Sequence, residues 1–248
     1  MTSMSFVRDT WVVLGKEWLE LRNSDSVWVT LSTLATFLLV IGVFLPWQLG
    51  ILWIQAPWVV VVWGWIPMFL VTTVTADAVA GERERRTLET LLATRLSDAS
   101  IFWGKWLSSV GWVWLAMLAC LPLGLITVNV QVAGGPHLPS LGQAAGTLAA
   151  AFAGAGLGAA AGVLVSMRAA SVRHAQQVLA IAALCAAFIP VGLLRVLPQD
   201  LTMPLLRALM YGSPTRAAWI AAAGLGLASL PLLAAGLGEF RRGHIPLK

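Results

Sequence analysis

Charged side chains are scarce in this sequence. Asp, Glu, Lys and Arg make up 11% of the 248 residues, whereas soluble domains carry about 25%. Apolar side chains make up 58%, and the mean hydropathy is +0.82. A soluble fold could not also hide several uninterrupted apolar runs of about 20 residues, the length of a helix that crosses a bilayer. The composition therefore excludes a soluble domain and predicts an integral membrane protein.

Groups that carry metal, redox or acid–base chemistry are also rare. Both cysteines lie inside apolar runs, where we expect inert small side chains and no disulfide. The three histidines lack metal-ligand spacing, and no ionisable residue falls near the middle of an apolar run. The phosphate-loop pattern G-x-x-x-x-G-K-[ST] is missing. We therefore expect no metal, no ATP site and no catalytic site in this chain, which disfavours a membrane-embedded protease or lipid transferase.

Six apolar runs are long enough to span a membrane, so we expect an all-α polytopic protein. They take up most of the chain, and residues 1–248 are therefore predicted to form a single transmembrane domain. The predicted spans are residues 27–45, 58–80, 107–130, 141–165, 177–197 and 216–238.

The distribution of Lys and Arg predicts the orientation. Thirteen of the 16 fall on one side if the N-terminus is cytoplasmic, and the first two outer loops contain none. The positive-inside rule then places both termini in the cytoplasm, as expected for a plasma-membrane protein. This explains the net charge of +5 without binding to nucleic acid.

Two segments outside the spans have amphipathic patterns. Residues 5–24 have helical periodicity, which predicts a helix that lies flat in the inner membrane interface, either as an anchor alone or also in contact with a cytoplasmic partner. Residues 198–215 mix leucines with three prolines and a glycine. We expect one or two short helices that re-enter the outer leaflet, with a solvated loop as the alternative.

Three glycines recur every fourth residue in the fourth predicted span. Gly154, Gly158 and Gly162 would form a smooth stripe on one helix face, which is suited to close helix packing. The partner of the stripe could be another helix of this chain or a second copy.

The charged residues concentrate after the second predicted span, in near balance of sign. A loop that only sets topology needs surplus Lys and Arg, so the acids require another reason. Read as a helix over 82–96, the segment forms i,i+4 pairs between Glu82 and Arg86 and between Arg85 and Glu89, beside a leucine stripe. Such a helix could dock into a groove of another protein, whereas the alternative is a solvated loop.

The residues of this window resemble the signature of ABC transporter permeases of the type-2 exporter class. The run DAVAGERERRTLETLLATRLS begins at Asp77, and Gly104-Lys105 follow it. The family typically has an acidic residue, then G-E-R-E-x-G-T-L-E-x-L-L-A-T-P, then G-K at the start of span three. Arg86 stands at the usual Gly position and Arg95 at the usual Pro position, so the sequence does not predict the turn or helix stop that these residues would give.

The resemblance implies a permease that pairs with a second permease chain, identical or homologous, and with two copies of an ATP-binding subunit that holds ATP and Mg²⁺. It implies that residues 82–96 are the coupling helix seated in a cleft of the ATPase, and that Asp77 and Lys105 support the ends of the neighbouring spans. The alternative is a permease-like subunit for haem delivery or membrane complex assembly. The implied ATPase-docking residues are Glu82, Arg83, Glu84, Arg85, Arg86, Thr87, Leu88, Glu89, Leu91 and Leu92.

Overall fold

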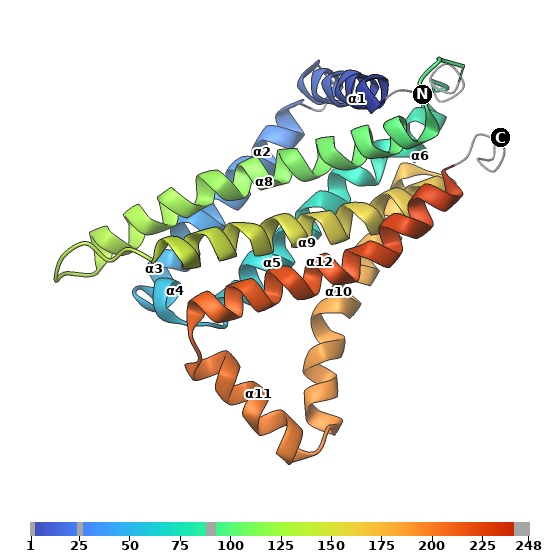
Figure 1. Ribbon diagram of the computed structural model, residues 1–248. Helices are drawn as coiled ribbons and strands as arrows, with labels where there is room; N and C mark the ends of the chain where they lie inside the picture. Colours follow the sequence, from blue (N-terminus) through green and yellow to red (C-terminus); the bar gives the residue numbers. More distant parts are fainter. Residues whose placement is uncertain (1–2, 24–26, 88–92, 241–248) are drawn as a thin grey trace.

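The computed structural model describes residues 3–23, 27–87 and 93–240, and helices are its only regular elements over these residues (Figure 1). Six helical segments are long and apolar enough to cross a membrane, which confirms the predicted all-α fold with six spans. These segments are Leu31–Leu49, Val59–Glu84, Asp98–Gln131, Leu141–Arg168, Val172–Val196 and Pro214–Glu239.

The helices follow one another with short connections. In chain order they are α1 (Ser3–Asn23), α2 (Val27–Leu39), the π-helical turn η1 (Val40–Phe44), α3 (Leu45–Leu49), α4 (Leu52–Gln55), α5 (Val59–Thr75), α6 (Asp77–Glu84), α8 (Asp98–Gln131), α9 (Leu141–Arg168), α10 (Val172–Val196), α11 (Gln199–Tyr211) and α12 (Pro214–Glu239).

Two spanning helices begin earlier than hydropathy indicates, because serine caps extend them into polar sequence. The Ser97 hydroxyl accepts a hydrogen bond from the Ser100 amide at the start of α8, nine residues before the expected start of the span at 107. Ser171 caps α10 in the same way through the His174 amide. A capping serine satisfies an amide that has no partner within its own helix.

Helix α9 lies at the centre of the bundle, with α8 and α12 beside it (Figure 1). Its glycine stripe packs on α5 of the same chain. A methyl group at Gly154 would overlap the carbonyl of Gly64, and one at Gly158 would meet the carbonyl oxygen of Met68. A methyl group at Gly162 would overlap the side chain of Thr75. The backbones of α5 and α9 therefore approach more closely than any larger residue would permit.

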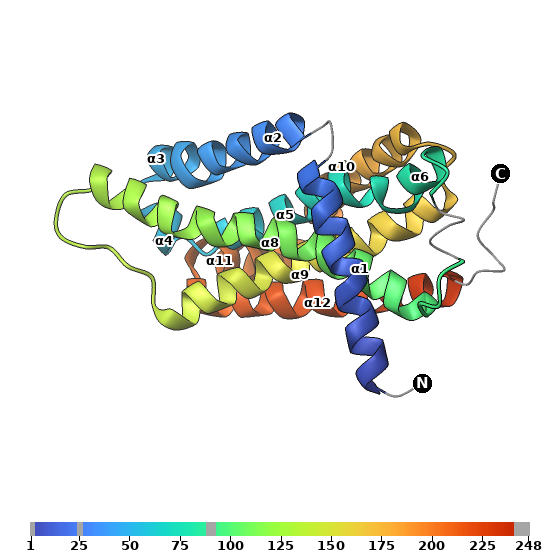
Figure 2. The ribbon, with the colours of Figure 1, turned by 90° about the horizontal axis from the view of Figure 1, so that it is seen from above.

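Helix α1 crosses α8 at a steep angle (Figure 2). Thr10 and Val13 are buried on its inner side, and Val13 fits against Gly104 of α8, where a methyl group would collide with it. Trp18 of α1 meets Trp112 of α8 edge-on, with ring centroids 6.0 Å apart. Val7 and Trp11 are exposed. The helix covers residues 5–23 of the predicted segment 5–24, and its location in the membrane interface stays a prediction.

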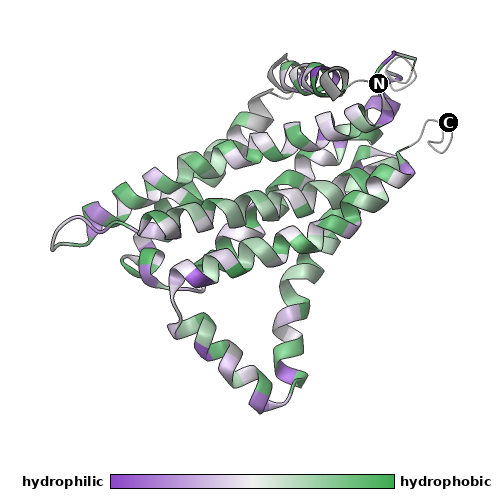
Figure 3. Cartoon of the chain, in the orientation of Figure 1, coloured by the Kyte–Doolittle hydropathy of each residue, from purple (hydrophilic) through white to green (hydrophobic). Residues whose placement is uncertain are grey.

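Hydrophilic residues gather at the two ends of the bundle, and the long helices are mostly apolar (Figure 3). One end contains α1, α6, the start of α8 and the end of α12. These elements and the end of α9 meet in a buried cluster that includes Val13, Val79, Phe102, Met167 of α9, and Phe240 directly after α12. This end is called the α6 end below.

Helix α11 and the far part of α10 project from the bundle (Figure 1). Many of their large apolar side chains are exposed, as Ile181 and Phe188 illustrate. The segment expected at 198–215 is thus mainly the single helix α11, and its re-entry into the outer leaflet stays a prediction.

Candidate functional site

The charged segment after the second span begins as a helix and stops early. Helix α6 follows α5 after one turn residue, Ala76, and ends at Glu84, so the expectation of one helix over 82–96 is wrong. Residues 85–87 turn away, residues 93–95 form a turn and bends, and residues 96–97 have no regular structure.

The backbone around Arg86 explains why the helix stops. Arg86 has a φ of 58°, its amide donates to the Arg83 carbonyl, and the Thr87 amide donates to the Glu82 carbonyl over 2.9 Å. This is a Schellman motif, whose left-handed residue is usually glycine. Arg86 stands where the resembling family has glycine, and the turn forms despite its side chain.

A serine of α9 satisfies the backbone at the junction between α5 and α6. The Ser166 hydroxyl accepts hydrogen bonds from the amides of Val79 and Ala80, at 3.0 and 2.9 Å, and donates to the Ala76 carbonyl. Ser166 is fully buried. These amides lie in the first turn of α6, where no partner exists within the helix. Ser166 therefore fixes the start of α6 on α9.

Arg83 and Glu84 fasten the end of α6 to the junction of α9 and α10. The Arg83 guanidinium donates to the carbonyls of Ala169 and Met167, at 2.7 and 2.9 Å. The Glu84 carboxylate accepts from the Val172 amide at 2.9 Å. A cation thus meets the carbonyl end of one helix and an anion meets the amide end of the next, as the helix dipoles favour.

Glu82 is buried in a cluster of charges that joins α6 to α1 and α8. Only 2% of Glu82 and 1% of Lys105 are exposed, and their charged atoms lie 3.0 Å apart. Lys16 of α1 also donates to Glu82. Lys105 donates to Glu17 over 2.7 Å, and Lys16 lies 3.2 Å from Glu20. These five residues, Lys16, Glu17, Glu20, Glu82 and Lys105, are called the charge cluster below.

The charge cluster offsets the cost of burying its members. An isolated buried charge is strongly unfavourable, so loss of one partner would leave another uncompensated. Burial alone lowers the pKa of Lys16, but the hydrogen bond to Glu82 and the charges of Glu17, Glu82 and Glu20 outweigh it and raise that pKa above its usual value. Lys16 therefore stays charged at any physiological pH.

Three carboxylates of the charge cluster lie close enough to suggest a metal site. Oxygens of Glu17, Glu20 and Glu82 fall within 4.8 Å of one another. However, the ammonium groups of Lys16 and Lys105 contact the same three carboxylates. Two cations already neutralise much of the charge that would attract a metal, so ion pairing is the better description of this group.

Asp77 at the start of α6 pairs with Arg85 directly after its end. Their side chains form a bidentate pair, with the shorter contact at 2.9 Å, and both are about half exposed. The predicted pair of Arg85 and Glu89 involves a residue outside the described part of the chain. The contact raises the pKa of the Arg85 guanidinium. Asp77 thus lies at the end of the second span, where the sequence suggested a supporting role.

The residues expected to face an ATPase divide into three groups. Four of them, Glu82, Arg83, Glu84 and Arg85, contact other parts of this chain. Arg86 and Thr87 are exposed at the turn. Leu88, Glu89, Leu91 and Leu92 lie outside the described residues.

Sequence reasoning missed the partners that hold α6 in place. Lys16, Glu17 and Glu20 could be assigned to a helix, but no local pattern connects them to residues some 65 positions later. Ser166 gave no signal at all, because a single serine in an apolar helix is unremarkable. Lys105 was noticed only through the Gly-Lys pair of the family signature.

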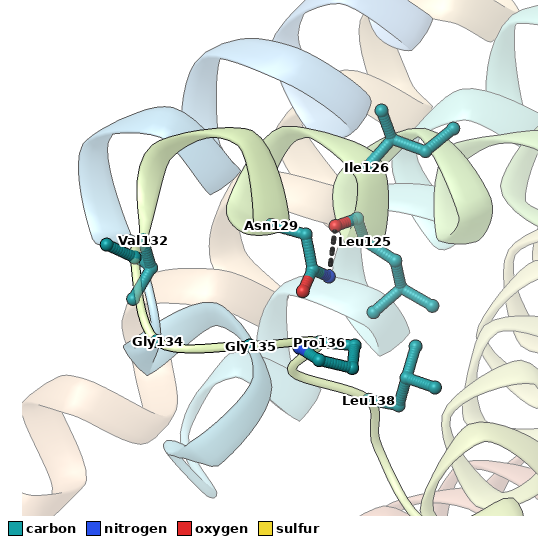
Figure 4. Close-up of a pocket in the computed structure, with 9 residues that line it drawn as sticks. Leu125, Ile126, Asn129, Val132, Gly134, Gly135, Pro136 and Leu138 are labelled. Carbon is teal, nitrogen blue, oxygen red and sulfur yellow. Dashed lines mark hydrogen bonds between the residues drawn. The ribbon is translucent and has the colours of Figure 1, made fainter.

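Cavities flank the described part of the bundle. One, of about 640 Å³, lies beside the charge cluster and reaches between α2, α5 and α8. Another, of about 480 Å³, lies at the opposite end under the Gly134-Gly135 loop. Figure 4 shows the side chain of Asn129 facing this loop. The Asn129 side-chain amide donates hydrogen bonds to the carbonyls of Leu125 and His137 and so holds the loop against α8.

Six apolar spans with a network of polar contacts at one end define a multi-pass membrane protein. The family model described as ABC-2 family transporter protein matches residues 61–226, about two thirds of the chain. The chain therefore belongs to the ABC-2 transporter family and is a membrane permease of an ABC transporter. The match includes α6 and the Gly104-Lys105 pair, in agreement with the resemblance found in the sequence. A search of curated proteins finds no match to the chain.

Proposed function

We propose that this permease serves an ATP-driven exporter, in which two permease chains form the substrate pathway and two separate ATPase chains bind ATP and Mg²⁺. The permease performs no hydrolysis itself. It transmits the motion of the ATPase through the segment 82–96, and it lies in the plasma membrane with both termini in the cytoplasm.

The fastening of α6 is the observation that carries this proposal. Three sets of polar contacts join this short helix to its neighbours: Ser166 and Arg83 to α9, Glu84 to α10, and the charge cluster to α1 and α8. A segment held so firmly moves as a rigid body with the helices around it. A push on the adjoining residues 86–96 would therefore reach several spans at once.

The structure changes which residues we expect to touch the ATPase. Glu82 is buried and Arg83 to Arg85 contact this chain, so they hold the coupling segment in position. The docking surface in this proposal is the exposed turn at Arg86 and Thr87 together with the leucines of 88–92.

Replacing Leu92 by Asp tests the docking surface. An unpaired carboxylate in an apolar contact is unfavourable, so we expect normal membrane insertion but reduced co-purification of the ATP-binding subunit and lost transport. Leu141→Asp is the matched control, because Leu141 is exposed at the opposite end of the bundle. Equal subunit recovery and transport for Leu92→Asp and the parent would overturn the proposal.

Cysteine labelling tests the orientation. In a variant without Cys120 and Cys185, a cysteine at Gln48 or Pro136 should react with an impermeant thiol reagent from outside, and one at Ser171 should not. The reverse pattern would place α6 outside and make contact with a cytoplasmic ATPase impossible.

A further inference from the structure

The cavity beside the charge cluster has the size of a small-molecule site. Its volume of about 640 Å³ lies within the range of about 300–1,000 Å³ typical of ligand pockets. Helices α1, α2, α5, α6, α8 and α10 all contribute to its walls. The coupling segment and four spanning segments therefore border the same space.

The walls of this cavity change character along α8. Glu17, Glu20 and Glu82 line it near the α6 end, and Ser108 and Ser109 lie beside them. Further along, the lining is apolar and includes Leu34, Leu70, Val113 and Ala116. The distance from Ser108 to Ala116 along the helix is about 12 Å at 1.5 Å per residue. The cavity thus suits a molecule with a polar head and an apolar body of roughly this length.

The polar wall and the lysines paired with it carry one negative charge in excess. Four carboxylates line the cavity, Glu17, Glu20, Asp77 and Glu82, and Arg85 is the one cation among its described lining residues. Lys16 and Lys105 do not line the cavity but pair with Glu17, Glu20 and Glu82. One additional positive charge in the cavity would therefore balance the described side chains. A monovalent cation fits this balance better than a divalent ion does.

A buried acceptor atom also lacks a donor. Oε1 of Glu82 contacts both lysines, whereas Oε2 has no hydrogen-bond partner within the described chain, although Glu82 is 98% buried and lines the cavity. An unmade hydrogen bond at a buried carboxylate is costly. A ligand N–H group could donate the missing hydrogen bond to Oε2 of Glu82. A quaternary ammonium group could not, because it has no N–H. Trp112 also lines the cavity, and an aromatic ring attracts a cation placed over its face.

We infer that this cavity binds a protonated amine with an apolar body, whose ammonium group donates to Glu82 and whose body lies along α8. Binding itself does not depend on the transporter role. The further statement that such amines are cargo rests on the proposed function.

Binding of decylamine, decanol and decanoate to the purified chain in nanodiscs tests the site, with empty nanodiscs as the background. The three probes share one alkyl chain and differ only in the head group. A charged hydrogen bond to a buried acceptor predicts at least tenfold tighter binding of the amine than of the alcohol, with the carboxylate weakest. Equal binding of amine and alcohol would overturn the inference.

Two variants locate the bound probe. Glu20→Gln removes the excess negative charge at a half-exposed position and should weaken amine binding about two- to fivefold without affecting the alcohol. Ala116→Phe fills the apolar part and should weaken both probes. Asp9→Asn removes a charge from α1, the helix that also carries Glu20, but Asp9 does not line the cavity. This variant should leave binding unchanged. Unaltered amine binding in both cavity variants would place the probe elsewhere.

Transport separates this inference from the proposed function. With the ATPase present, decylamine should stimulate ATP hydrolysis in the parent and less so in Ala116→Phe. Amine-selective binding without any stimulation or transport would preserve the site but reject the exporter role. Transport of other cargo without amine-selective binding would reject the amine site but preserve the exporter role.

Discussion

Helices α9 and α10 are similar in sequence character but differ in burial. Their most apolar windows have mean hydropathies of 2.0 and 2.3, yet 56% of the α9 window is buried inside the chain and only 12% of the α10 window. The difference lies in side-chain size. Helix α9 offers glycines and alanines that allow α5 and α12 to approach, whereas α10 carries exposed bulky residues such as Ile181 and Phe188. In a membrane, close packing rather than hydropathy decides which helix forms the core.

The largest effect should follow from filling the glycine stripe. In Gly158→Leu the new side chain would meet the backbone of α5 at Met68, so we expect a loss of about 3 kcal/mol or more, or failure to fold. Gly192→Leu on α10 is the control, because nothing lies within 4 Å of its added methyl position. Thermal unfolding and monodisperse yield in detergent measure both. Equal tolerance of the two leucines would remove the distinction between the helices.

The next effect concerns charges, with a buried pair compared with an exposed one. Lys105→Ala leaves the buried carboxylate of Glu82 with one fewer cation and should cost about 3–5 kcal/mol. Arg168→Ala breaks an exposed pair with Glu239 and should cost at most about 1 kcal/mol. Chemical denaturation of the purified variants gives both values. The double variant Glu82→Gln with Lys105→Met should recover much of the loss, and if it does not, the charge cluster does more than neutralise buried charge.

The smallest effect belongs to the exposed face of α10. Phe188→Ala removes a side chain that is 68% exposed, so the unfolding temperature of the single chain should hardly change, with a free-energy difference within about 0.5 kcal/mol. Val163→Ala on α9, at a fully buried position, should cost about 1 kcal/mol or more by comparison. A large loss of stability in Phe188→Ala would mean that Phe188 of α10 packs against this chain.

Hydropathy predicted the six spans because a bilayer imposes a minimum apolar length on each helix. The spacing of the glycines predicted the stripe but not its partner helix. Close packing on α5 and close packing on a second copy would require the same small residues. The error at 82–96 has a physical cause. The charges fit i,i+4 pairing, yet Glu82 pairs with residues of α1 and α8, and Arg85 pairs with Asp77 at the start of α6. The left-handed turn formed at an arginine. Contacts between distant segments, such as Lys16 with Glu82, leave no local trace in the sequence.

The central claim is that the turn after α6 docks on an ATP-binding subunit, and site-specific photo-crosslinking in native membranes tests it most directly. A photo-reactive residue in place of Thr87, which is exposed beside the fastened helix α6, should crosslink to the ATP-binding chain. The same residue in place of Leu138, exposed at the opposite end, should not. A crosslink from Thr87 that mass spectrometry assigns to the ATP-binding chain is the predicted result. Absence of that crosslink in a complex that still hydrolyses ATP and transports would contradict the account.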